Sequence, residues 1–259
     1  MILTEMAGQT FTWPMTTSPP ITCTSTMATE LRSPQGHGRT DLFFGGAADQ
    51  PSEIYLQKSN GTFSKSPDQL PALHAGYEDV SAIFFDADGD GDDDLYVGSG
   101  GNAAEPGAAV YQDRLYLNDK GKFATTPMPR IPTSTGAVAT IDYDADGDLD
   151  LLIGGRSFPG AYPSAPRSYL LRNDAAKFTD VTAEVIPALA NIGMVTAIAV
   201  GNIEGDDRPE IVVAGEWMPV TIFTGGADGF TAAPSLSADY SGIWHSLLLR
   251  NAVQITYAF

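Results

Sequence analysis

Residues 85–101 read Phe-Asp-Ala-Asp-Gly-Asp-Gly-Asp-Asp-Asp-Leu-Tyr-Val-Gly-Ser-Gly-Gly, a stretch dominated by carboxylates. Asp86, Asp88 and Asp90 stand at alternate positions before a glycine, and Asp94 follows that glycine three residues later. Two unit charges ~4 Å apart repel by roughly 4 kcal/mol at an effective dielectric of about 20. A folded loop that gathers these side chains therefore needs a cation. Hard oxygen ligands in a flexible loop favour calcium.

The same nine-residue pattern recurs along the chain. It is intact at 142–150 and altered at 202–210, where asparagine and glutamate take some of the aspartate positions. Only its last part is present near the N-terminus, where Asp41 precedes an apolar run that ends in two glycines. The loops begin at residues 86, 142 and 202. Successive loops therefore start 56 and 60 residues apart, an interval that suits a four-stranded propeller blade with long loops.

Strand-like segments flank each acidic loop. Apolar runs precede the loops, and we expect them to be strands buried on both faces; they are 80–85, 137–141 and 195–200. A second apolar strand follows each loop, and a hairpin with turn residues such as Asn60-Gly61 comes next. The sequence therefore predicts an all-β fold, a β-propeller of about four four-stranded blades in a partial or incomplete ring.

The two ends of the chain differ from the repeats. Residues 1–36 are rich in serine and threonine, show no persistent period and are predicted to be irregular or disordered, with an irregular edge strand as the alternative. Residues 37–249 are assigned to the blades and 250–259 to an irregular tail. Because the pattern fades at both ends, one hypothesis is that the chain is a fragment of a longer propeller, or an open reading frame whose ends are out of frame with the ancestral sequence.

Composition narrows the function classes. The formal net charge is −18 and the isoelectric point is about 4.2, which argues against nucleic-acid binding because that function needs a basic face. No apolar run approaches the ~18 residues of a membrane span. The single cysteine, Cys23, excludes an intrachain disulfide, and no signal peptide is recognisable at the N-terminus.

The repeated Asp-x-Asp-x-Asp-Gly-x-x-Asp pattern, followed by a hydrophobic strand and glycines, resembles FG-GAP/VCBS repeats. These are the calcium-bearing blades of integrin α-subunit propellers and of many bacterial secreted proteins. The resemblance covers roughly residues 38–235. Motifs such as Gln112-Asp-Arg-Leu-Tyr-Leu-Asn118 and Val213-Ala-Gly-Glu-Trp-Met-Pro219 are also similar to bacterial relatives of the cartilage acidic protein family.

The resemblance implies calcium ligands at the first, third, fifth and ninth positions of each loop, and a backbone carbonyl at the seventh. In the two intact loops these positions are Asp86, Asp88, Asp90, Asp92 and Asp94, and Asp142, Asp144, Asp146, Asp148 and Asp150. In the third loop the side-chain positions are Asn202, Glu204, Asp206 and Glu210. There glutamate is longer than aspartate, and Asp207 lacks the conformational freedom of glycine, so calcium binding by this loop is left open.

The leading functional hypothesis is a calcium-stabilised, non-catalytic binding or adhesion module. We expect it outside the cytoplasm: in the extracellular space, in the periplasm or at the cell surface. The alternatives are a carbohydrate-binding or carbohydrate-active, lyase-like propeller and a structural spacer of a larger secreted protein. Loops 102–113 and 156–167, which carry Tyr111 and Tyr162, are candidate contact surfaces for a protein or carbohydrate ligand. Unclosed propeller edges would favour self-association.

Overall fold

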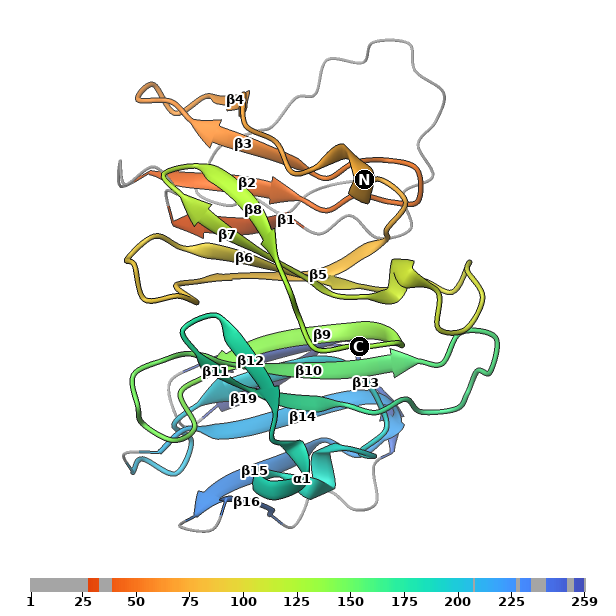
Figure 1. Cartoon of the computed structure of the whole chain (residues 1–259). Helices are drawn as coiled ribbons and strands as arrows, with labels where there is room; N and C mark the ends of the chain where they lie inside the picture. The colour runs from red at the N-terminus through yellow and green to blue at the C-terminus, as the bar shows by residue number, and fades with distance from the viewer. Residues whose placement is uncertain are drawn as a thin grey trace.

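The protein is described by a computed structural model, which places residues 28–32, 39–206, 208–226, 229–233, 241–250 and 254–258. Within these residues the chain forms four successive antiparallel sheets, each built in chain order, and a terminal hairpin (Figure 1). No helix of the described part is long and apolar enough to span a membrane. The fold is all-β, and the sheets are the predicted propeller blades.

Four strands make up each blade. Blade 1 contains β1 (Ala28–Arg32), β2 (Thr40–Phe44), β3 (Glu53–Gln57) and β4 (Phe63–Lys65). Blade 2 contains β5 (Asp79–Phe85), β6 (Asp94–Ser99), β7 (Arg114–Asp119) and β8 (Lys122–Thr126). Blade 3 contains β9 (Ser134–Ile141), β10 (Asp150–Ser157), β11 (Tyr169–Asp174) and β12 (Lys177–Asp180). Blade 4 contains β13 (Met194–Gly201), β14 (Glu210–Met218), β15 (Thr221–Gly226) and β16 (Gly229–Ala232).

The remaining elements are short. The helical turns are η1 (Ala72–His74), η2 (Ala109–Tyr111), α1 (Thr182–Val185) and η3 (Pro187–Leu189). Strand β17 (Gly242–Ile243) adds to β14, and β18 (Ser246–Arg250) pairs with β19 (Gln254–Ala258). Because β18 packs beside β13, this terminal hairpin continues the series of blades after blade 4.

Apolar side chains fill the space between neighbouring blades. Phe43 of β2 packs with Leu95 of β6, and separate clusters join blade 2 to blade 3 and blade 3 to blade 4. A fourth cluster lies between β14 and β18. Burying one such leucine or phenylalanine contributes about 1.5–3 kcal/mol. Each blade is therefore held mainly by its neighbours, as the stacking in Figure 1 shows.

The burial of the strands corrects one prediction. The apolar runs before the acidic loops do form the first strands β5, β9 and β13, but their residues alternate between buried and half-buried. The second strands, β6, β10 and β14, are the ones buried on both faces. They lie inside each sheet and between neighbouring blades, whereas each first strand lies at a sheet edge.

The two terminal segments also contain strands, and at the N-terminus this agrees with the alternative of an edge strand. Strand β1 lies within the segment 1–36 and pairs with β2, and β19 lies within the tail 250–259 and pairs with β18. Both strands owe their conformation to a partner strand, a long-range influence that overrides weak local propensity. Residues 1–27 and 33–38, which carry the rest of the first prediction, lie outside the described residues.

A buried ion pair links blade 2 to the chain that enters it from blade 1. The Arg114 guanidinium pairs with the Asp79 carboxylate, and both side chains are almost fully buried. Asp79 also accepts hydrogen bonds from the Gly46 N–H at 2.7 Å and the Ser52 hydroxyl at 2.8 Å, both from blade 1. Arg114 also lies over the Tyr77 ring, 4.2 Å from its centroid. This network ties the first two blades together.

Replacing Asp79 by alanine is expected to lower the free energy of unfolding by about 3–5 kcal/mol, because a buried guanidinium would lose its counter-charge. Urea titration measures the change. The matched control is Arg172→Ala, which removes an exposed ion pair with Asp174 and should leave the midpoint unchanged. Equal losses in the two variants would contradict the stabilising role assigned to the buried pair.

Candidate metal centres

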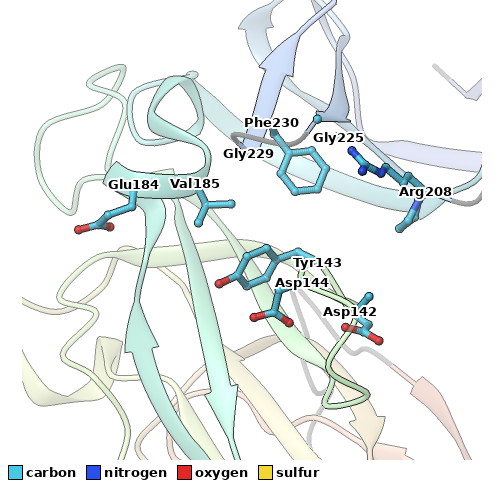
Figure 2. Close-up of a pocket in the computed structure, with 12 residues that line it drawn as sticks. Asp142, Tyr143, Asp144, Glu184, Val185, Arg208, Gly225, Gly229 and Phe230 are labelled. Atoms are coloured by element: carbon cyan, nitrogen blue, oxygen red, sulfur yellow. The ribbon is translucent and has the colours of Figure 1, made fainter.

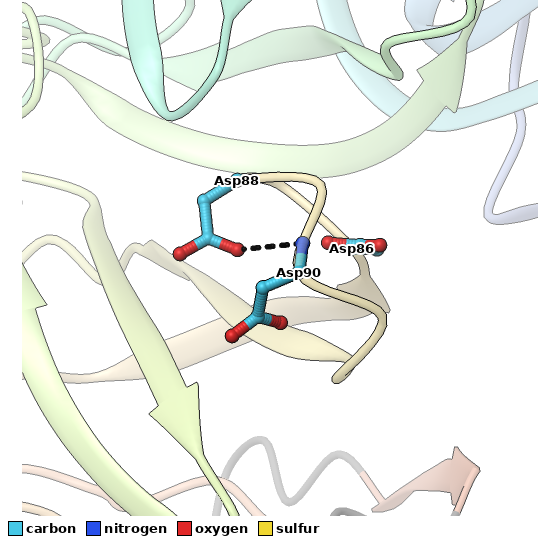
Figure 3. Close-up of side chains that lie close together, drawn as sticks. All are labelled: Asp86, Asp88 and Asp90. Carbon is cyan, nitrogen blue, oxygen red and sulfur yellow. Dashed lines mark hydrogen bonds between the residues drawn. The ribbon is translucent and has the colours of Figure 1, made fainter.

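The first acidic loop connects β5 to β6 and gathers three carboxylates. Asp86, Asp88 and Asp90 each offer an oxygen, and these atoms lie within 4.8 Å of one another. Figure 3 shows the three side chains on one turn of the loop, with the Asp90 N–H directed at the Asp88 carboxylate, 3.2 Å away. The predicted first, third and fifth positions therefore come together and can hold a metal ion.

Backbone N–H groups hold this loop in its shape. Asp86 accepts from the Gly89 N–H at 2.8 Å and from the Gly91 N–H at 3.0 Å. Asp90 accepts from the Asp92 N–H at 2.9 Å. Gly91 has a φ of 92°, in the left-handed region, which is why the sixth position of the pattern is glycine.

The second loop, between β9 and β10, repeats this arrangement. Asp142, Asp144 and Asp146 also place one oxygen each within 4.8 Å of the others, and Gly147 has a φ of 97°. The Oδ1 atom of Asp142 is buried and has no hydrogen-bond partner among the described residues. A buried carboxylate oxygen without a donor is costly. This donor set therefore fits a hard cation.

The ninth-position carboxylates lie apart from these groups of three. Asp94 is fully buried and accepts from the Asn118 N–H of β7 at 2.7 Å and from the Ala87 N–H at 2.8 Å. Asp150 likewise accepts from the Asn173 N–H of β11 at 2.8 Å and from the Tyr143 N–H at 3.1 Å. Each of these carboxylates ties the acidic loop, the second strand and the third strand together.

Blade 1 keeps this part of the pattern. Asp41 is fully buried and accepts from the Gln57 N–H of β3 at 2.7 Å. The residues that precede it at alternate positions, 33, 35 and 37, were predicted to bind no calcium and lie outside the described residues. The ninth-position aspartate therefore has a role in the fold that does not require the upstream carboxylates.

Burial changes the acidity of these groups. It raises the pKa of Asp94 to about 6 and that of Asp150 to about 7, from 3.8, and the nearby loop carboxylates act in the same direction. The backbone N–H donors oppose this effect without cancelling it. Burial also raises the pKa of Asp88. Asp88, Asp94 and Asp150 therefore resist ionisation in the absence of a cation.

The seventh position and an unpredicted asparagine connect each loop to the next hairpin. The Asp92 carboxylate accepts from the Lys120 N–H at 3.1 Å, and Asp148 is placed 3.4 Å from the Ala175 N–H in the same way. The Asn118 side chain donates to the Asp93 carbonyl at 3.0 Å. These side chains of Asp92 and Asp148 face the hairpin, which leaves their backbone carbonyls as the predicted ligands.

The asparagine repeats in blade 3 and reaches across to blade 2. The Asn173 amide donates to the Leu149 carbonyl at 3.2 Å and to the Ala87 carbonyl of the first loop at 2.8 Å. Ala176 N–H donates to the same Ala87 carbonyl at 2.8 Å. Sequence reasoning missed these asparagines, although both stand at the end of the third strand, where the repeat signals them. Through Asn173, the first loop contacts the next blade.

The third loop differs. The Asn202 side-chain amide donates to the Asp206 carbonyl, and its Oδ1 accepts from the Gly205 N–H at 2.6 Å. The buried Glu210 carboxylate accepts from the Glu204 N–H at 3.1 Å. Among the described residues, the acidic side chains of this loop form no group like the first two. Asp207 lies outside the described residues.

A pocket of about 500 Å³ lies between the second loop and blade 4. Figure 2 shows Phe230 of β16 above Tyr143, with the acidic pair Asp142 and Asp144 below and Arg208 to one side. The pocket arises where two blades meet. The pocket could not be predicted from the sequence, because nothing in the repeat pattern indicates that Arg208 and Phe230 lie near the second loop.

In calcium-free protein, the urea midpoint is expected to fall as the pH rises from about 4 to about 7. The folded pKa values of Asp94 and Asp150 lie above the unfolded value, so the folded state binds more protons in this window and the unfolding free energy decreases with pH. Asp150→Asn should flatten this slope, and the exposed control Asp68→Asn should not. A midpoint that rises with pH in chelator would contradict the raised pKa values.

Comparison with protein-family models gives a match at residues 35–97, described as an FG-GAP-like repeat. The matched range contains β2 to β5, the first acidic loop and the first part of β6. No curated protein matches the chain significantly. The FG-GAP resemblance inferred from the acidic pattern is confirmed over this range: the chain carries an FG-GAP-like repeat at residues 35–97.

Proposed function

We propose that this chain is a calcium-stabilised β-propeller that serves as a non-catalytic binding or adhesion module outside the cytoplasm. The observation that carries the proposal is the pair of acidic groups on equivalent loops of neighbouring blades. Both groups offer oxygen atoms alone and sit on loops that the fold already holds in shape. The FG-GAP-like match across the first loop supports the same reading.

The chemistry of the donor set favours calcium over other cations. Calcium accepts six to eight oxygen ligands in flexible geometry, whereas magnesium requires near-ideal octahedral geometry. Each loop offers three carboxylates and a backbone carbonyl, and water would complete the coordination. Extracellular modules typically bind calcium with dissociation constants of about 10⁻⁴–10⁻³ M. Such affinities match the calcium outside cells, which supports the proposed location.

The role proposed for the cation is structural. A bound ion would supply the positive charge that three clustered carboxylates lack. The chain's own residues do the rest: Asp94 fixes the loop to β7, and Asn173 fixes the first loop to blade 3. Stiffening one loop therefore stabilises a blade and its contact with the next blade.

The contacts of Ser99 and His74 within the fold support a non-catalytic role. The Ser99 hydroxyl donates to the Gln112 carbonyl at 2.9 Å. His74 Nδ1 lies 2.7 Å from the Tyr116 hydroxyl, and burial, together with the nearby Arg114, lowers the His74 pKa. Ser99 is fully buried, and both side chains are hydrogen-bonded within the fold.

Calcium is expected to raise the melting temperature, and excess chelator is expected to lower it. With calcium at ~100 times its dissociation constant, each site adds roughly 2.7 kcal/mol to the free energy of unfolding. Differential scanning calorimetry with calcium and with chelator measures the shift. Asp88→Ala and Asp144→Ala should each remove about half of it.

The matched control is Asp68→Ala, which removes an exposed carboxylate of blade 1 outside the acidic loops and should keep the full calcium shift. Magnesium at the same concentration should give a smaller shift. An unchanged melting curve in chelator would overturn the proposed role of calcium. A full shift in the double variant of Asp88 and Asp144 would place the ions elsewhere.

A further inference from the structure

We infer that the blade edge opposite the acidic loops carries a carbohydrate-binding platform, in which the Trp217 indole and the Tyr162 ring present a sugar-stacking surface beside the Arg156–Glu216 ion pair. The inference rests on the proposed binding function and names its ligand class and its site. The platform lies where β10 and β14 end, whereas the acidic loops lie where these strands begin (Figure 1).

Trp217 occupies a backbone position that disfavours large side chains. Its φ is 60°, in the left-handed region. The pairing of β14 with β17 skips this residue, since Glu216 pairs with Ile243 and Met218 with Gly242. Trp217 is therefore the extra residue of a β-bulge, a feature that re-aims side chains and is common beside functional sites. Strained backbone of this kind concentrates at ligand-binding sites.

The equivalent position of blade 2 holds a glycine. Trp217 follows the ninth-position Glu210 by the same interval that separates Gly101 from Asp94 in blade 2. Gly101 has a φ of 81°, so the same conformation is filled by glycine there. Blade 4 instead places the largest side chain at this point and leaves 61% of it exposed. Trp217 is therefore largely exposed on a backbone conformation that disfavours a large side chain.

Hydrogen bonds orient the two rings. Trp217 Nε1 donates to the Tyr162 hydroxyl at 3.0 Å, and that hydroxyl is 3.3 Å from Glu216 Oε2. Glu216 is only 8% exposed, and its Oε1 accepts from Arg156 Nη2 at 2.8 Å and Nε at 3.1 Å. Tyr162 is 56% exposed, so both rings are held in place and open to solvent.

A small cavity adjoins the rings. It has a volume of about 240 Å³ and is lined by Pro163, Ala165, Gly193, Met194, Glu216 and Trp217. This volume lies below the roughly 300–1,000 Å³ of pockets for drug-sized ligands and suits one small ring. A buried carboxylate beside an exposed indole gives the cavity one polar and one apolar wall.

A saccharide matches this combination of groups. The C–H face of a sugar ring is complementary to the electron-rich face of an indole or phenol ring. Sugar hydroxyls can both donate to Glu216 and accept from Arg156, so they pair with both charges without breaking the ion pair. One sugar ring carries both a C–H face and several hydroxyls, so it can meet the indole and the ion pair together. Rigid aromatic rings with adjacent polar groups also lose little conformational entropy on binding.

Affinity electrophoresis of the full chain in calcium tests the inference, with gels that contain xylan, mixed-linkage β-glucan, galactomannan, pectin or alginate, and a glycan array covers shorter oligosaccharides. We expect retardation or array binding by at least one of these glycans. Trp217→Gly should reduce the affinity at least tenfold and Tyr162→Ala several-fold, whereas Trp217→Phe should retain part of it.

Two controls separate binding from folding. Leu73→Ala removes an exposed apolar side chain far from the platform in sequence and should bind like the wild type. Trp217→Gly should not lower the melting temperature, because glycine relieves the positive φ. Loss of binding at an unchanged or raised melting temperature is the expected signature, and a large fall in melting temperature would make Trp217 a structural residue.

The inference is overturned if no glycan retards the protein or binds on the array, or if Trp217→Gly binds as the wild type does. Capture of a protein partner through Trp217 with no glycan binding would overturn it too. Failure of the calcium proposal is distinguishable, since it appears as a melting curve that chelator does not change.

Discussion

A buried carboxylate at the start of each second strand is the constraint on which the first three blades depend. Asp41, Asp94 and Asp150 are fully buried and accept an N–H from the end of the third strand. This bond joins the second strand to the third strand at the beginning of the second strand. Because burial raises the pKa of Asp94 and Asp150, the group that secures each blade is also hard to ionise. A cation in the adjacent loop would offset that cost.

The repeat pattern predicted the strands well because burial and turn chemistry recur with it. Glycine at the sixth position marks a left-handed residue, and Asn-Gly marks a hairpin, so local chemistry was enough. The face on which strands are buried was not predictable in the same way. The first strands and the second strands, such as β5 and β6, are both apolar, and only their place at the edge or inside the sheet separates them. Strands β1 and β19 were missed because a partner strand defines them.

In the candidate sites, too, local groups could be predicted and contacts between distant segments could not. The groups of three carboxylates could be predicted because their members are two residues apart on one loop. The ninth residue was predicted as a ligand like the others, which stays a prediction, and the structure adds backbone donors to Asp94 from the loop itself and from β7. The contact between Asn173 and Ala87 joins residues far apart in the chain, and so does the Arg156–Glu216 pair. Such contacts follow from how blades pack, which a single repeat does not encode.

The two edges of the blades have diverged to different extents. At the loop edge, the spacing of the acids persists from blade 2 to blade 3. At the opposite edge, blade 2 has Gly100 and Gly101, where an added Cβ would lie 2.3 Å from Val80 and from Glu78 atoms, respectively. The corresponding positions include Arg156 in blade 3 and Glu216 in blade 4, whose side chains project and pair with each other. A repeat edge that keeps its residues serves the scaffold, and an edge that varies from blade to blade is free to acquire a ligand.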